Sequence, residues 1–262
     1  MSIKLRQRQS GSGYITTITY SREEKLNSLN SEGIQELHQA FLSLSNDEDL
    51  RAIVLTGAGS KAFFGGADIF EMSELNSKGA KEFITSLHEL FLAIRSHPVP
   101  VIARINGYTL GAGMELAAAC DLRVSVDTAI FGMPEVRVGL PSVIEAALLP
   151  RLIGWGRSNY LVLTAENISA TKAYEWGFLE KICTEHTLEK EINAISDAIA
   201  CSGANAVRIQ KALVGKWEQL SLEDSITAGI DAFEDAYKTD EPNIMMQPFL
   251  NRKKGNNSNP YP

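Results

Sequence analysis

Two glycine-bearing turns in the sequence could bring backbone amide groups close to a ligand. The first covers residues 63–69 (FFGGADI), shortly after an apolar segment that ends at Thr56. The second covers residues 106–116 (NGYTLGAGMEL) and joins an apolar segment to an expected helix. Small residues let N–H groups approach a ligand, and the first N–H groups of a helix have no partner inside it. Because the helix dipole is positive there, such amides suit a developing negative oxygen.

Two glutamates are candidates for acid–base chemistry beside these amides. Glu115 follows Ala112 by three residues, so a helix would place its side chain on the same face, one turn from the Ala112 N–H. Glu135 lies in the otherwise apolar segment 129–136 (AIFGMPEV). If both carboxyls reached one apolar pocket, their pKa values would be raised and split, so that one could act as acid and the other as base near neutral pH.

Each of these features also has an ordinary structural explanation. Glycine at a strand-to-helix turn often only relieves crowding, and an acidic residue in a first helical turn often only complements the helix dipole. The sequence has no G-x-S-x-G nucleophile motif, no phosphate-binding loop and no H-E-x-x-H. Its four histidines lack ligand spacing, so we expect no metal site: His38, His88, His97 and His186.

An alternation of strand and helix patterns must position the two turns. The segments that read as strands are 14–20, 50–57, 99–107 and 121–126, and those that read as helices are 31–45, 83–94 and 110–120. Strands that alternate with helices predict an α/β fold with parallel, right-handed βαβ connections. From about residue 142 the pattern becomes mostly helical. We therefore predict an α/β core over 1–195, a helical region over 196–254 and a disordered polar tail over 255–262.

Composition limits the classes of function. The chain has 262 residues, 44% of them hydrophobic, and a formal net charge of −7 without a basic stripe, so we expect no nucleic-acid partner. Its longest apolar stretches fall short of the roughly 20 residues that a membrane span needs, so we expect no membrane association. The first ten residues lack the pattern of a secretory signal. Three widely spaced cysteines favour neither disulfides nor zinc, and we expect a cytoplasmic protein.

Four motifs, taken together, resemble those of one known family. They are AFFGGADI, PVIARINGYTLGAGMELAAACDLR, AIFGMPEVRVGLP and LLPRLIG, in this order. The sequence resembles the crotonase superfamily, the enoyl-CoA hydratase/isomerase family, over nearly all of residues 14–254. The resemblance implies a crotonase-like spiral of ββα units with a helical C-terminal region used in oligomerisation. It also implies a homotrimer or a dimer of trimers, with sites near subunit boundaries.

The resemblance implies an activity and a catalytic set. The activity is that of an enoyl-CoA hydratase, the reversible addition of water to a 2-enoyl-CoA thioester. The amides of Ala67 and Ala112 would hold the thioester oxygen as an oxyanion hole, and Glu115 and Glu135 would be the catalytic carboxyls. Our hypothesis is that Glu135 is the main acid/base at the α-carbon and Glu115 the base for water. No metal or redox cofactor is implied, and coenzyme A enters only as part of the acyl-CoA substrate.

The resemblance also implies a site for the coenzyme A moiety. The nucleotide would lie near the loop Lys61 to Phe64, a basic residue near Lys25 would approach its phosphates, and two C-terminal residues would close the site from an adjacent subunit. Lys25 and Lys253 could equally be solvated lysines, and Asp68 and Asp121 fit a capping or bracing role better than a chemical one. The candidate substrate-binding residues are Lys25, Lys61, Ala62, Phe63, Gly66, Asp68, Ile69, Gly111, Phe249 and Lys253.

The sequence departs from the family pattern in two places. Ala112 stands where hydratases commonly have glycine, which is tolerable for a backbone donor if its φ is negative. Residues 143–145 (VIE) replace a Gly-Gly pair, which makes the pocket bulkier and adds a possible third carboxylate, Glu145. We expect Glu145 to be exposed on the surface. If it instead acted as an acid, the chain could be a Δ3,Δ2-enoyl-CoA isomerase; another acyl-CoA dehydratase or lyase, or a non-catalytic CoA-binding scaffold subunit, also stays open.

Overall fold

The computed structural model describes residues 2–252, which are built on a six-stranded main sheet. Its strand order is β1 (Ile3–Ser10), β2 (Gly13–Tyr20), β3 (Leu50–Gly57), β5 (Val101–Ile105), β7 (Leu122–Val126) and β10 (Lys181–Cys183). β1 pairs antiparallel with β2, and the other neighbours are parallel. The predicted strands are confirmed, whereas β1 was not predicted because its side chains are mostly exposed and polar.

A second, four-stranded sheet runs beside the first and positions the glycine-bearing turns. It contains β4 (Ala62–Phe64), β6 (Tyr108–Leu110), β8 (Ile130–Gly132) and β9 (Ile168–Ser169). β4 pairs parallel with β6, and β6 pairs parallel with β8. Along the chain, β4 comes after β3 of the main sheet, β6 after β5 and β8 after β7. This repeated strand pair gives the predicted spiral. Because β4, β6 and β8 run in the same direction, the segments after them emerge at one edge of the sheet.

Capped helices connect the strand pairs. Asn30 caps α1 (Ser31–Leu44) through the Gly33 N–H, and Asn76 caps α3 (Ser77–Arg95) through the Gly79 N–H. α1 and α3 pack against each other and bury apolar stripes at helical spacing. η1 (Glu23–Lys25) is a single helical turn before α1, and the short α2 (Ile69–Ser73) lies between α1 and α3 in sequence. α4 (Ala112–Ala119) is buried on all sides.

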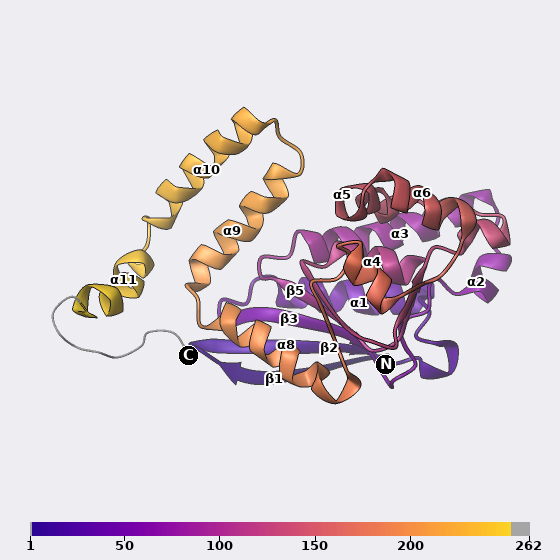
Figure 1. Ribbon diagram of the computed structural model, residues 1–262, viewed down its shortest axis with the longest axis horizontal. Helices are drawn as coiled ribbons and strands as arrows, with labels where there is room; N and C mark the ends of the chain where they lie inside the picture. The colour runs from indigo at the N-terminus through magenta and orange to yellow at the C-terminus, as the bar shows by residue number, and fades with distance from the viewer. Residues whose placement is uncertain (1, 253–262) are drawn as a thin grey trace.

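The C-terminal third is helical, as predicted. After two turns, η2 (Glu135–Val138) and η3 (Ile144–Leu148), come α5 (Leu149–Ile153), α6 (Trp155–Thr164), α7 (Ala170–Glu175), α8 (Glu185–Ala200), α9 (Ala204–Trp217), α10 (Leu222–Ala236) and α11 (Glu241–Arg252). α8 packs on the main sheet, whereas α9, α10 and α11 extend away from it (Figure 1). No helix within residues 2–252 is long and apolar enough to cross a membrane. The domain boundary predicted at residue 195 falls inside α8 and stays a prediction.

One lysine–aspartate ion pair, with the backbone hydrogen bonds of its two partners, braces the junction between this region and the core. The ammonium of Lys211 on α9 lies 2.7 Å from an Asp121 carboxylate oxygen and donates to the backbone oxygens of Ile94 and Val99. The same Asp121 oxygen accepts a hydrogen bond of 2.7 Å from the Val101 N–H at the start of β5. Asp121 therefore has the bracing contacts that the sequence favoured for it.

Candidate active site

A cavity of about 410 Å³ lies where the chain leaves β4, β6 and β8. Ala67 follows β4, Ala112 follows β6 and Glu135 follows β8, and all three line the cavity with Glu115 of α4. The structure thus brings together the four residues that the sequence assigned to catalysis. Parallel pairing explains this, since Leu110 is in register with Gly132 and Phe64 with Thr109.

Two amide N–H groups at this cavity are free to bind a ligand. Within residues 2–252, neither the Ala67 N–H nor the Ala112 N–H has an acceptor in the protein. Ala112 is the first residue of α4, and its φ is not positive, which meets the condition set above for an alanine at this position. A glycine precedes each alanine and turns the chain there. Gly66 has a φ of +113° and Gly111 a φ of +51°.

Glu115 is held in a strongly perturbed environment. Its side chain is buried, and one carboxyl oxygen accepts a hydrogen bond of 3.1 Å from the Ala146 N–H. Burial, followed by the negative charge of Glu135 and then that of Glu145, raises the pKa of Glu115 to about 8, and the bond from Ala146 offsets part of this effect. A carboxyl of this kind keeps its proton at neutral pH.

Glu135 reaches the cavity from η2, whereas Glu115 reaches it from α4. It begins η2, directly after Pro134, and accepts a hydrogen bond of 2.7 Å from the Ser142 hydroxyl. One of its carboxyl oxygens lies so close to Gly111 that a Cβ at that position would come within 2.4 Å of it. Gly111 therefore leaves space for the carboxyl as well as turning the chain into α4.

The remaining walls are mostly apolar, with two cations. Much of the apolar surface comes from Met72, Phe83, Ile84, Leu87, Leu140 and Val143. Lys25 also lines the cavity and lies 4.5 Å from the centre of the Phe70 ring. Arg137 lines it too and pairs with Glu166 at 2.8 Å. An acyl chain fits the apolar surface, and a phosphate would meet the cations.

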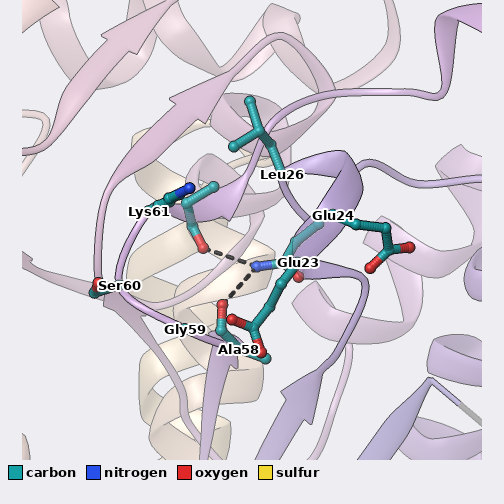
Figure 2. A pocket seen from close by; sticks show the side chains of 9 residues that line it. Glu23, Glu24, Leu26, Ala58, Gly59, Ser60 and Lys61 are labelled. Atoms are coloured by element: carbon teal, nitrogen blue, oxygen red, sulfur yellow. Dashed lines mark hydrogen bonds between the residues drawn. The ribbon is translucent and has the colours of Figure 1, made fainter.

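The predicted substrate-binding residues divide between this cavity and its neighbour. Five of them line the first cavity: Lys25, Gly66, Asp68, Ile69 and Gly111. Lys61 and Ala62 line an adjacent cavity of about 340 Å³, together with Glu23 and Glu24. Figure 2 shows this second cavity, where the Asn27 amide donates to the backbone oxygens of Ala58 and Ala62. Leu26 lines both cavities, so they adjoin.

Some predicted residues lie elsewhere. Phe63 is fully buried, and its ring packs edge-on against Phe64, so only its backbone could meet a ligand. Phe249 lies on α11, at the end of the molecule opposite α2 (Figure 1), and does not line this cavity. Lys253 lies outside the described residues. Asp68 caps α2 through the Phe70 and Glu71 N–H groups, as its predicted capping role requires.

The expectation that Glu145 is exposed on the surface is wrong. It is only 3% exposed and does not line the cavity. The physical reason is a pair of partners on α3, His88 and Arg95, that makes burial of the charge tolerable. Nothing in the local sequence reveals them, because they lie 50 or more residues earlier in the chain.

Two functional contacts were missed by the sequence analysis. The Ser142 hydroxyl bonds to Glu135, and the Ala146 N–H bonds to Glu115. Serine has no motif that distinguishes this role, and a backbone donor carries no sequence signal at all. The only available signal was the departure of residues 143–145 from the glycines that hydratases commonly have there.

Comparisons with known proteins agree with this geometry. A family model described as Enoyl-CoA hydratase/isomerase matches residues 10–259. The chain is 32% identical to the short-chain-enoyl-CoA hydratase of Clostridium acetobutylicum, over 92% of this chain and 93% of that protein. It is 33% identical to the crotonyl-CoA hydratase of Syntrophomonas wolfei, over 92% and 94%. The crystal structure of an enoyl-CoA hydratase from Bacillus anthracis superposes with a TM-score of 0.91 at 31% identity, covering 96% and 97% of the two chains.

Proposed function

Because this chain belongs to the enoyl-CoA hydratase/isomerase family, we propose that its cavity catalyses the reversible addition of water to a 2-enoyl-CoA thioester, as an enoyl-CoA hydratase. The observation that carries this proposal is the meeting of two unpaired amides and two glutamates in one cavity. Amides can stabilise an enolate, and a carboxyl pair can move the protons that hydration requires. The substrate class is an acyl-CoA thioester.

The amides of Ala67 and Ala112 would bind the thioester oxygen. When the β-carbon is attacked, the electron pair of the double bond moves onto that oxygen and gives an enolate. Fixed N–H groups stabilise such a charge without reorganising, and in other enzymes one such donor contributes about 3–4 kcal/mol to catalysis. The reaction we propose therefore uses no metal or redox cofactor, since amides hold the charge and carboxyls move the protons.

The two carboxyls divide the proton transfers. In hydration, a water between them gives a proton to Glu115 while its oxygen bonds to the β-carbon. The α-carbon of the enolate then takes a proton from Glu135, which completes the addition. In dehydration Glu135 removes the α-proton, and Glu115 protonates the departing hydroxide. Each direction requires one proton on the pair.

The raised pKa of Glu115 supplies that proton. At neutral pH the free site keeps a proton on Glu115, which is the form that begins dehydration. A bridging water can pass the proton to Glu135 to begin hydration. As the pH rises through about 8, Glu115 loses its proton, and we expect kcat/KM to fall on the alkaline side.

The coenzyme A moiety would extend from the cavity over its rim. Lys25 would approach the phosphates, and backbone groups of Lys61 to Phe64 would contact the nucleotide beside the second cavity. We propose that Phe249 and Lys253 close the site from a neighbouring subunit of a homotrimer or a dimer of trimers. The absence of a disulfide pattern in the sequence supports a cytoplasmic location.

The test is an assay of crotonyl-CoA hydration, which is measured as the loss of absorbance of the conjugated double bond. Glu135→Gln should lower kcat at least ~100-fold, because the amide can neither give nor take the α-proton. Glu175→Gln, an exposed glutamate on α7, is the matched control and should keep full activity.

Two outcomes would contradict the proposal. A Glu135→Gln variant that keeps most of its activity would remove this carboxyl from the mechanism. Turnover of a 3-enoyl-CoA but not of crotonyl-CoA would favour the isomerase, and binding of CoA without turnover of either would favour a scaffold. The sequence argument for the isomerase used Glu145 as the acid, and the buried position of that residue outside the cavity removes this support.

A further inference from the structure

Glu145 is a buried carboxylate that the reaction proposed above does not use. It lies on η3, which packs against both α3 and α4. The Nδ1 atom of His88 is 3.0 and 3.2 Å from its two carboxyl oxygens, and a guanidinium nitrogen of Arg95 is 4.0 Å from one of them. With both partners on α3, Glu145 ties η3 to that helix.

The next residue along η3 contacts one of the two catalytic carboxyls directly. Ala146 donates its N–H to Glu115 at 3.1 Å, so the position of η3 sets the position of the Glu115 carboxyl. The preceding residue, Ile144, has a φ of +42°, which is unfavourable for a β-branched side chain and costs about 1–3 kcal/mol. A turn with such a conformation needs contacts that hold it in place, and the ionic contacts of Glu145 are adjacent to it.

We propose that Glu145 is a positioning residue for the acid–base pair: it anchors η3 to α3, so that Ala146 orients Glu115, and it places a fixed negative charge behind Glu115. The inference rests on the proposed function, because it assigns a task to Glu145 within that reaction. Glu145 touches no substrate in this account and acts only through Glu115.

The charged groups around the two carboxyls make the electrostatic part testable. Arg95 and His88, whose ring is charged only when it is protonated, face Glu145 from α3, and α4, which carries Glu115, packs against η3. The charge of Glu145 raises the pKa of Glu115, in addition to burial and to the charge of Glu135 on the cavity side.

Two further groups border this network where α9 and α5 approach it. Glu218, at the end of α9, pairs with Arg95 at 2.5 Å. Arg151 of α5 donates to the backbone oxygen of Glu218 at 2.8 Å. Arg95 is therefore shared between Glu145 and Glu218, and its removal leaves the Glu145 charge less compensated.

The experiment compares the pH profiles of kcat/KM for crotonyl-CoA in two variants, one of which removes a negative charge and the other a positive charge. Glu145→Gln removes a negative charge behind Glu115, lowers its pKa, and should move the alkaline limb to lower pH by about 0.5 unit or more. Arg95→Gln removes a positive charge and should move the limb to higher pH. Glu89→Gln, an exposed neighbour on α3, is the control and should leave the limb in place.

A merely structural ion pair predicts a different result. Loss of a buried partner would then lower stability or kcat in both variants without moving the limb in opposite directions. A folded Glu145→Gln protein with an unmoved limb, or limbs that move the same way in both variants, would overturn the proposal. If Glu145→Gln does not fold, Arg95→Gln alone decides the question. An alkaline limb at the wild-type pH in Arg95→Gln would overturn the proposal.

A second measurement separates this inference from the proposed activity. The pH dependence of unfolding, compared in each background with and without Glu115→Gln, reports the titration of Glu115 whether or not the enzyme turns over. Opposite shifts in that titration for Glu145→Gln and Arg95→Gln would support the inference even if crotonyl-CoA were not a substrate. Unchanged titration in an active enzyme would overturn the inference and leave the proposed function intact.

Discussion

A buried carboxyl with a raised pKa links catalysis to stability at the scale of a single residue. Glu115 is protonated in the folded protein at a pH where it would be ionised in the unfolded chain. Between pH 4.5 and about 8 the folded state therefore binds more protons than the unfolded state, and stability falls as the pH rises through this range. The group that makes acid–base chemistry possible thus destabilises the fold at the pH of use.

Replacing this carboxyl by an amide removes the titration. Glu115→Gln should raise stability by no more than about 1 kcal/mol at pH 5 and by about 4–5 kcal/mol at pH 9, because the ionised form no longer has to be buried. Urea unfolding at the two pH values measures the difference. Equal effects of the substitution at pH 5 and pH 9 would contradict the raised pKa. Activity should fall sharply in the same variant.

At the scale of elements, one glycine both ends a strand and makes room for a catalytic side chain. Gly111 has a φ of +51°, and a Cβ there would lie 2.4 Å from a Glu135 carboxyl oxygen. Gly111→Ala should therefore add backbone strain of about 1–3 kcal/mol and also displace Glu135, with at least a ~100-fold loss of kcat.

A second glycine gives the matched comparison. Gly177 has a φ of +86°, and its Cβ would meet no heavy atom closer than 3.6 Å. Gly177→Ala should carry the backbone strain alone and keep kcat within about two-fold, because it lies outside the cavity. Thermal melts and crotonyl-CoA assays of both variants separate strain from displacement. Equal kcat values in the two variants would show that Gly111 leaves no space that Glu135 needs.

The elements that the sequence predicted are those with a clear period or a long apolar run. Residues 50–57 form β3 with the predicted bounds, and α1 ends one residue before the predicted helix does. The three-residue strands β4, β6 and β8 are too short to show alternation, yet they bring the turns together. The residues of the site could therefore be named from their types and motifs, whereas their meeting point could not.

The same limit explains the one contradicted expectation about the site. A lone glutamate in a sequence is normally exposed, because an unpaired buried charge is costly. Glu145 is buried because the fold supplies His88, 57 positions away. Partners at that separation are fixed by tertiary packing, which no local pattern encodes.

At the scale of the whole molecule, the charge distribution suits an anionic substrate only locally. The net charge of −7 repels coenzyme A at long range, but salt screens this repulsion beyond about 8 Å. Lys25 and Arg137 line the cavity itself and supply the opposite sign where the phosphates would bind. Local cations can therefore hold an anion that the protein as a whole does not attract.

The helices that extend from the core leave apolar side chains uncovered in a single chain. On α10, Ile226, Ile230 and Phe233 recur at helical spacing and are 59%, 66% and 69% exposed. An apolar stripe of this kind is typical of a subunit interface. It fits the proposed homotrimer, in which these helices would pack against a neighbouring chain near its active site.

A charge placed in that stripe should therefore break the assembly. Ile230→Asp should shift the protein toward monomers in sedimentation velocity, because an isolated carboxylate in an apolar interface is costly to bury. Thr227→Asp, which adds the same charge outside the stripe on the same helix, should leave the assembly intact. If Phe249 and Lys253 close the site of an adjacent subunit, the monomeric variant should also show a raised KM for crotonyl-CoA. A wild-type protein that sediments as a monomer would contradict both the interface and this dependence of substrate binding on it.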